Sequence, residues 1–82
     1  MSDVRKVLRE IIAEVGEIDD VESITDDANL FRDLGLDSMQ ALEIVLEIER
    51  RLDVTLSEEM LRQITSLGEA VQLAERLTAA KP

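Results

Sequence analysis

Apolar residues recur with the period of an α-helix in four stretches of the chain. The pattern predicts helices over about residues 3–15, 38–52, 58–63 and 67–79, of which the third is short. The first stripe consists of Val4, Val7, Leu8, Ile11, Ile12 and Val15. The sequence contains no strand-like alternation of useful length. The predicted fold class is therefore all-α, a small four-helix bundle with three main helices and one short helix.

Residues that favour helix ends stand beside these stretches. Ser2 or Asp3 can cap the first helix, and Gly16 stands where a left-handed residue would close it. Ser66 and Glu69 have the spacing of a capping box at the start of the last helix.

A long loop, residues 17–37, is predicted between the first two main helices. About twenty residues without a regular element are unusual in a small domain and are typical of a functional or well-packed loop. Its apolar residues are Ile18, Val21, Ile24, Leu30, Phe31, Leu34 and Leu36. We expect Leu30, Phe31 and Leu34 to fold back onto the core.

The helix over 38–52 has an apolar arc of roughly 220°, which is wider than one side of a small bundle buries. Met39, Leu42 and Leu46 lie together on this arc. We expect them to be partly exposed and available to a partner, and the alternative is that the later helices cover them.

Composition narrows the possible functions. The chain has 82 residues, no Cys and no His, so it lacks the usual thiol, general base and metal ligands, which disfavours ordinary hydrolases and metalloenzymes, and we expect one domain. The net charge is −10 and Phe31 is the single aromatic residue, which disfavours nucleic acid and membrane partners. Signal peptides and membrane spans are not apparent, so we expect a cytoplasmic protein. We also expect a monomer.

The negative charge is concentrated in one part of the chain. Residues 14–49 contain twelve acidic residues and one base, Arg32, which gives a net charge of −11. Such a segment attracts basic protein surfaces, although a solvated acidic loop is the simpler interpretation. Calcium binding through Asp19, Asp20, Asp26 and Asp27 does not fit the twelve-residue loop pattern, so no metal site is predicted.

A turn with candidate chemistry precedes the helix over 38–52. Gly35 permits a tight turn, Asp37 or Ser38 can act as N-cap, and Ser38 lies near unpaired backbone N–H groups. A phosphate ester on Ser38 would be well placed there, whereas the simpler alternative is an ordinary serine cap. Ser38 is not expected to be a hydrolytic nucleophile, because the chain has no His to activate it.

This turn, Asp33-Leu34-Gly35-Leu36-Asp37-Ser38-Met39, resembles the D-L-G-x-D-S-[LM] signature of the acyl carrier protein family. Leu42-Glu43-Ile44 and the helix end Glu49-Arg50-Arg51-Leu52 extend the resemblance, which covers nearly the whole chain. It implies that residues 1–82 form a single carrier domain. Leu36, Met39, Gln40, Arg50 and Arg51 depart from residues common in the family, and both a fatty-acid carrier and a specialised polyketide or peptide carrier remain possible.

The resemblance implies that a phosphopantetheinyl transferase attaches 4′-phosphopantetheine to Ser38, next to the motif acid Asp37. The arm then holds acyl groups as thioesters. The implied partners are acyl-transferring and condensing enzymes with basic docking surfaces. The implied docking residues are Asp37, Met39, Leu42, Glu43, Leu46, Glu47 and Glu49. An acidic helical adaptor without a prosthetic group is the alternative function, and an aliphatic core that opens to an acyl chain is an additional hypothesis.

Overall fold

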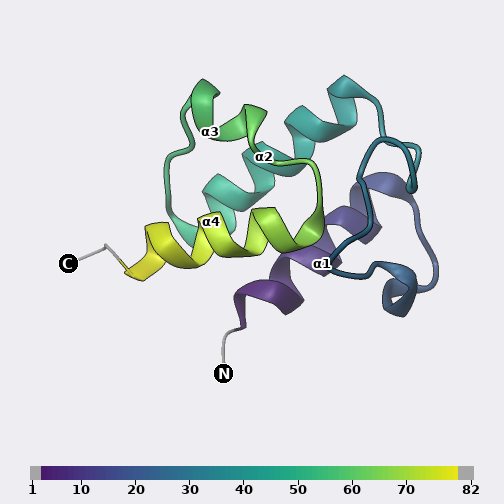
Figure 1. Ribbon diagram of the computed structural model, residues 1–82. Helices are drawn as coiled ribbons and strands as arrows, with labels where there is room; N and C mark the ends of the chain where they lie inside the picture. The colour runs from purple at the N-terminus through teal and green to yellow at the C-terminus, as the bar shows by residue number, and fades with distance from the viewer. Residues whose placement is uncertain (1–2, 80–82) are drawn as a thin grey trace.

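The computed structural model describes residues 3–79 and has four α-helices in this range (Figure 1). The helices are α1 (Val4–Gly16), α2 (Ser38–Leu52), α3 (Glu58–Arg62) and α4 (Leu67–Ala79), and a short 3₁₀ turn, η1 (Val21–Ser23), lies in the long loop. Helix α1 packs against both α2 and α4. The predicted all-α fold class is confirmed, and η1 is an addition to the prediction.

The core of the described chain is aliphatic. Helix α1 buries Leu8, Ile11 and Ile12, while α2 contributes Ile44 and Ile48. Helix α4 adds Leu67, Ala70, Val71, Leu73 and Ala74. Burial of these stripes is the main force that holds the helices together, because each helix alone is too short to be stable in water.

Hydrogen bonds fix the long loop to the start of α4, and an ion pair fixes it to α1. The N–H of Leu30 donates to the carbonyl oxygen of Thr65 over 2.9 Å, and the N–H of Gly68 donates to that of Asp26 over 2.8 Å. The Asp26 carboxylate also pairs with Arg5 of α1 at 3.1 Å. These contacts fix the middle of the loop against α1 and the start of α4. From there the chain runs to the start of α2.

The loop side chains are buried to different extents. Leu30 is buried and Leu34 is half-buried against the core, as expected, but Phe31 remains 43% exposed, so its predicted return to the core is wrong. The turn that carries Phe31 is held by Asn29, whose side-chain oxygen accepts the N–H of Phe31 over 2.9 Å. Phe31 consequently lies at the rim of a surface cavity next to α2.

The ends of α1 differ from the prediction. Gly16 is still helical, and Glu17 is the residue with the left-handed conformation, at φ 53°. A Cβ on Gly16 would lie 2.9 Å from Cδ2 of Leu36, so the glycine provides room for packing. Asp3 occupies the N-cap position without a side-chain hydrogen bond to the helix, and Ser2 lies outside the described residues. None of the helices in residues 3–79 is long and apolar enough to cross a membrane.

Candidate functional site

Asp37 and Gln40 together cap the N-terminus of α2. The N–H of Gln40 donates to Oδ1 of Asp37 over 2.8 Å, and the N–H of Asp37 donates to Oε1 of Gln40 over 3.0 Å. This reciprocal pair is a capping box, which satisfies two donors that the helix leaves unpaired. Asp37 is therefore the N-cap, and Ser38 is the first residue of the helix.

Ser38 is exposed, and its hydroxyl makes no hydrogen bond to any described residue. The chain reaches this position through Gly35, which has a left-handed φ of 70°. A residue with a Cβ would be strained in this conformation, so glycine suits the turn. The result is an unengaged hydroxyl at the positive end of the helix dipole.

Gln40 also connects α2 to α1. Its Nε2 atom donates to the carbonyl oxygen of Val15 over 3.3 Å. One side chain thus fixes both the cap of α2 and the approach of α1 to it. Our sequence reasoning did not assign this role to Gln40, although the Asp37–Gln40 spacing contains the capping-box pattern.

Asn29 and Asp33 stabilise the turn before Ser38. The N–H of Asn29 donates to Oδ2 of Asp33 over 2.8 Å, and the N–H of Asp33 donates to the carbonyl oxygen of Asn29 over 2.9 Å. The hydrogen bond that the N–H of Asn29 donates to the carboxylate, followed by the charge of Arg32, lowers the pKa of Asp33 below its ordinary value. The role of Asn29 was also missed, and its signal is the tendency of asparagine to bond the backbone two or three residues ahead.

An apolar cavity of about 350 Å³ lies beside Ser38. Ser38, Leu42 and Ile48 of α2 contribute to its wall, opposite Phe31 of the loop and Leu61 of α3. Cavities of this size hold small apolar ligands in other proteins. The cavity therefore fits a hydrocarbon chain attached near Ser38.

The outer face of α2 presents an apolar stripe. Met39, Leu42 and Leu46 are 71%, 53% and 55% exposed. The expectation that these side chains are partly exposed is therefore confirmed, and α3 and α4 do not cover them. Three exposed side chains of this size on one helix face are typical of a contact surface.

The four acidic candidates around α2 have different environments. Asp37 and Glu43 are exposed and make no ion pair with any residue in 3–79. Both oxygens of Glu47 are held by arginines, with Arg50 at 2.6 Å and Arg51 at 3.2 Å. Glu49 is half-buried and accepts the N–H of Leu56 over 2.8 Å.

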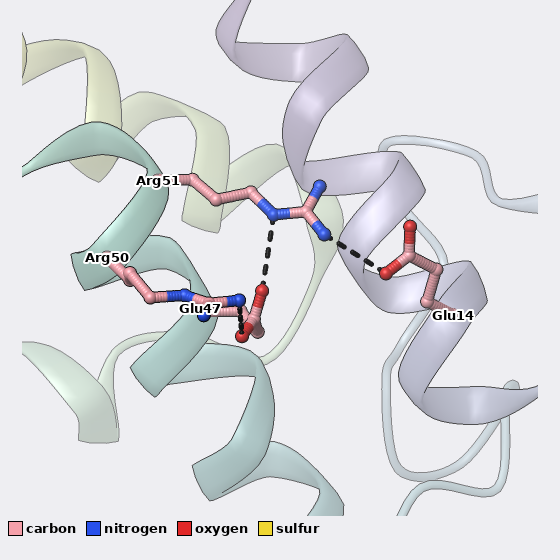
Figure 2. Close-up of polar contacts among 4 residues, drawn as sticks. All are labelled: Glu14, Glu47, Arg50 and Arg51. Carbon is pink, nitrogen blue, oxygen red and sulfur yellow. Dashed lines mark hydrogen bonds and ion pairs between the residues drawn. The ribbon is translucent and has the colours of Figure 1, made fainter.

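Figure 2 shows how Arg51 ties α2 to α1. Arg51 donates to Glu47 on its own helix and also reaches Glu14 of α1 at 3.1 Å. The hydrogen bond from Arg50 is the largest cause of the lowered pKa of Glu47. Glu47 is therefore ionised and internally neutralised.

Three of the four aspartates considered for calcium have separate partners. Asp20 accepts the N–H of Glu22, Asp26 pairs with Arg5, and Asp27 accepts the hydroxyl of Thr25. Among residues 3–79 no three potential metal-binding side chains come together as a metal site.

Comparison with known proteins identifies the family. The sequence model described as a phosphopantetheine attachment site matches residues 6–74. The chain is 42% identical over 69 residues to "Polyketide-8 synthase acyl carrier protein 2" of Streptomyces avermitilis, covering 84% of this chain and 78% of the relative. It is 33% identical over 81 residues to "Acyl carrier protein" of Amoebophilus asiaticus, covering 99% of this chain and 100% of the relative.

The site is compatible with the group that the family carries. The free Ser38 hydroxyl, the helix N-terminus and the neighbouring apolar cavity suit a phosphate ester with an acylated arm. The family match favours this carrier function over the acidic adaptor considered above. The chain thus belongs to the acyl carrier protein family, and it is a carrier of acyl groups in fatty-acid or polyketide biosynthesis with covalently bound 4′-phosphopantetheine, not a catalyst.

Proposed function

We propose that Ser38 is the residue to which 4′-phosphopantetheine is attached. The observation that carries this proposal is the distribution of roles at the start of α2. Asp37 and Gln40 cap the helix, which leaves the hydroxyl of the exposed Ser38 free to react. A serine that served as the cap itself would have its oxygen occupied by a backbone N–H.

The transfer reaction needs a nucleophile and a group that stabilises the negative charge of the product. Ser38 Oγ gives its proton to a base on the transferase and forms a bond to the phosphorus of coenzyme A that carries pantetheine. The phosphoanhydride bond of coenzyme A breaks, and adenosine 3′,5′-bisphosphate leaves. The N-terminus of α2 favours the negative charge of the resulting phosphodiester. When bound, the group supplies the thiol that this chain, which has no Cys, lacks.

Mass spectrometry tests the attachment site. The protein is incubated with coenzyme A and a broad-specificity phosphopantetheinyl transferase, and we expect the mass of one phosphopantetheine group to be added. Ser38→Ala should stay unmodified, whereas Ser23→Ala, which removes another exposed serine hydroxyl, should be modified like the wild type. Attachment at another residue, or none to the wild type, would disprove the proposal.

We further propose that partner enzymes dock along α2. Carriers of this family interact with a phosphopantetheinyl transferase and with biosynthetic enzymes, and we assign to these partners basic docking surfaces. The proposed contact residues are Asp37, Met39, Leu42, Glu43, Leu46, Glu47 and Glu49. Because Glu47 and Glu49 have internal partners, Asp37 and Glu43 are expected to contribute most of the attraction.

Kinetics can test this surface. Neutralising Glu43 and Glu47 together should slow association with the transferase and weaken its salt dependence, because fewer charges steer the encounter. Circular dichroism should show unchanged helicity. Unchanged association kinetics would place the docking surface elsewhere.

We propose a cytoplasmic monomer without nucleic acid or membrane partners, on the basis of its strong negative charge. A relative from Schizosaccharomyces pombe is named as mitochondrial. It is 29% identical to this chain over 79 residues, and the aligned region covers 96% of the chain and 70% of that relative. Cell fractionation would test the cytoplasmic location, and a membrane-bound protein would contradict it. Sedimentation would test the monomeric state, and a dimer would contradict it.

A further inference from the structure

The exposed face of α2 changes its charge along the helix. Glu43, Leu46 and Arg50 lie at positions i, i+3 and i+7 and so share one face. The rise of an α-helix places Glu43 and Arg50 about 10 Å apart along the axis. From the Ser38 end, a partner meets an acid first, then an apolar side chain, and then a base.

Glu47 does not alter this order, because its charge is already compensated. Its carboxylate binds Arg50 through one oxygen and Arg51 through the other, and its side chain is only 28% exposed. Arg51 in turn binds Glu14 of α1 (Figure 2). The two acids and two bases of this cluster sum to zero net charge, so Glu43 is left as the acid of this face that makes no ion pair within residues 3–79.

Arg50 remains available to a partner despite its bond to Glu47. Its side chain is 73% exposed, and the bond to Glu47 uses one of its terminal nitrogens. A guanidinium group has five N–H donors, so most of its donors face water or a docked protein. An open groove of about 650 Å³ between α1 and α2 has Glu17 and Glu43 as well as Arg50 and Leu46 in its wall.

We propose that this face selects an enzyme surface with charges of both signs. The matching surface has a base opposite Glu43, an apolar contact over Leu46, and a carboxylate opposite Arg50, about 10 Å from the base. A uniformly basic surface would place one of its cations against Arg50, which is unfavourable. The inference rests on the proposed docking along α2 and adds the charge pattern that the partner must have.

A second copy of the chain is a less suitable occupant. Two antiparallel copies of α2 would match acid with base, but each molecule carries a net charge of −10, which opposes association. The enzyme surface is therefore the occupant that the charges favour.

The test uses the holo-protein and an acyl transferase of the source organism, with malonyl-coenzyme A as donor. Arg50→Gln and Glu43→Gln should each raise the KM for the holo-protein about threefold and leave kcat unchanged, because each removes one exposed charge pair. Arg62→Gln removes an exposed base from α3 and serves as the matched control.

Different results would overturn the inference. A KM that falls or stays the same in Arg50→Gln would show that the partner surface is uniformly basic or does not reach Arg50. A wild-type dimer in sedimentation that dissociates in Arg50→Gln would assign the face to a second copy. The mass of the attached arm is measured first, so a failure of attachment at Ser38 is recognised before the variants are compared.

Discussion

Asp37 combines two properties that substitutions can separate. Its carboxylate accepts the N–H of Gln40, which stabilises α2, and its charge lies next to Ser38. Asparagine retains the acceptor oxygen but has no charge, and alanine has neither. The same position therefore distinguishes the contribution of the cap from that of the charge.

We expect Asp37→Ala to lower the free energy of unfolding by about 1 kcal/mol, because it removes a helix cap. Asp37→Asn should stay close to the wild type, since the two residues cap equally well. Urea denaturation measures both variants. If the two lose the same stability, the charge of Asp37 and not its hydrogen bond stabilises the helix. If neither loses stability, the cap contributes nothing measurable.

Helix α2 was well predicted because its signals are local. The Asp37 cap and the apolar period define the range Ser38–Leu52, and the wide apolar arc indicated that Met39, Leu42 and Leu46 would be exposed. The motif turn was also visible in the sequence, so Ser38 could be identified as the candidate serine from the sequence alone. The hydrogen bonds and the cavity around it required the structure.

Contacts between distant parts of the chain were less predictable. Gly16 was expected to end α1, but its packing under Leu36 depends on the path of the loop. The bond from Gln40 to Val15 joins residues 25 positions apart, and no local pattern indicates it. The N–H that Glu49 accepts belongs to Leu56, beyond the end of α2, so this partner required the structure. The pairs of Glu47 with Arg50 and Arg51, in contrast, have the i, i+3 and i, i+4 spacing of neighbours on one helix.

Glu49 connects α2 to the segment before α3. Its Oε2 atom accepts the N–H of Leu56, and both residues are shielded from water in part. Glu49→Ala should lower the free energy of unfolding by about 1 kcal/mol, because the N–H of Leu56 loses its acceptor. Glu49→Gln keeps an acceptor oxygen and should be nearly neutral, as thermal unfolding can show. Equal stability of the alanine variant and the wild type would show that the hydrogen bond to Leu56 contributes nothing measurable to folding.

The acid stability of the whole molecule follows from carboxylates with lowered pKa values. Hydrogen bonds from Thr65 are the largest cause of the lowered pKa of Glu69, and Asp33 and Glu47 are lowered as well. A carboxylate with a lower pKa in the folded state contributes stability above its unfolded pKa and loses it as pH falls through the folded value. Unfolding should therefore become easier below pH 4.5, the ordinary glutamate value.

We expect Glu69→Gln to flatten this acid dependence, because the amide does not titrate and still accepts hydrogen bonds. Urea midpoints between pH 7 and pH 3 measure the effect. Glu59→Gln removes an exposed charge from α3 and controls for the change in net charge. Identical slopes for wild type and Glu69→Gln would show that the Thr65 contacts do not couple protonation to folding.

The cavity beside Ser38 links the aliphatic core to the transport of acyl groups. No ring is buried in the described core, and aliphatic side chains adjust more easily to a guest than fixed rings do. The cavity of about 350 Å³ is bounded by α2, α3 and the loop. We propose that a long acyl chain enters it and that the thioester is thereby protected from water.

A cavity-filling substitution tests this protection. A long-chain thioester on the wild-type protein should hydrolyse several times more slowly than a short-chain one. Ala41 lies in the cavity wall, so Ala41→Leu reduces the space for the chain. It should speed the hydrolysis of the long-chain thioester and leave that of the short-chain one unchanged, which serves as an internal control. Equal rates for both chain lengths on the wild-type protein would mean that the chain stays outside, and the cavity would then be only a gap in the packing.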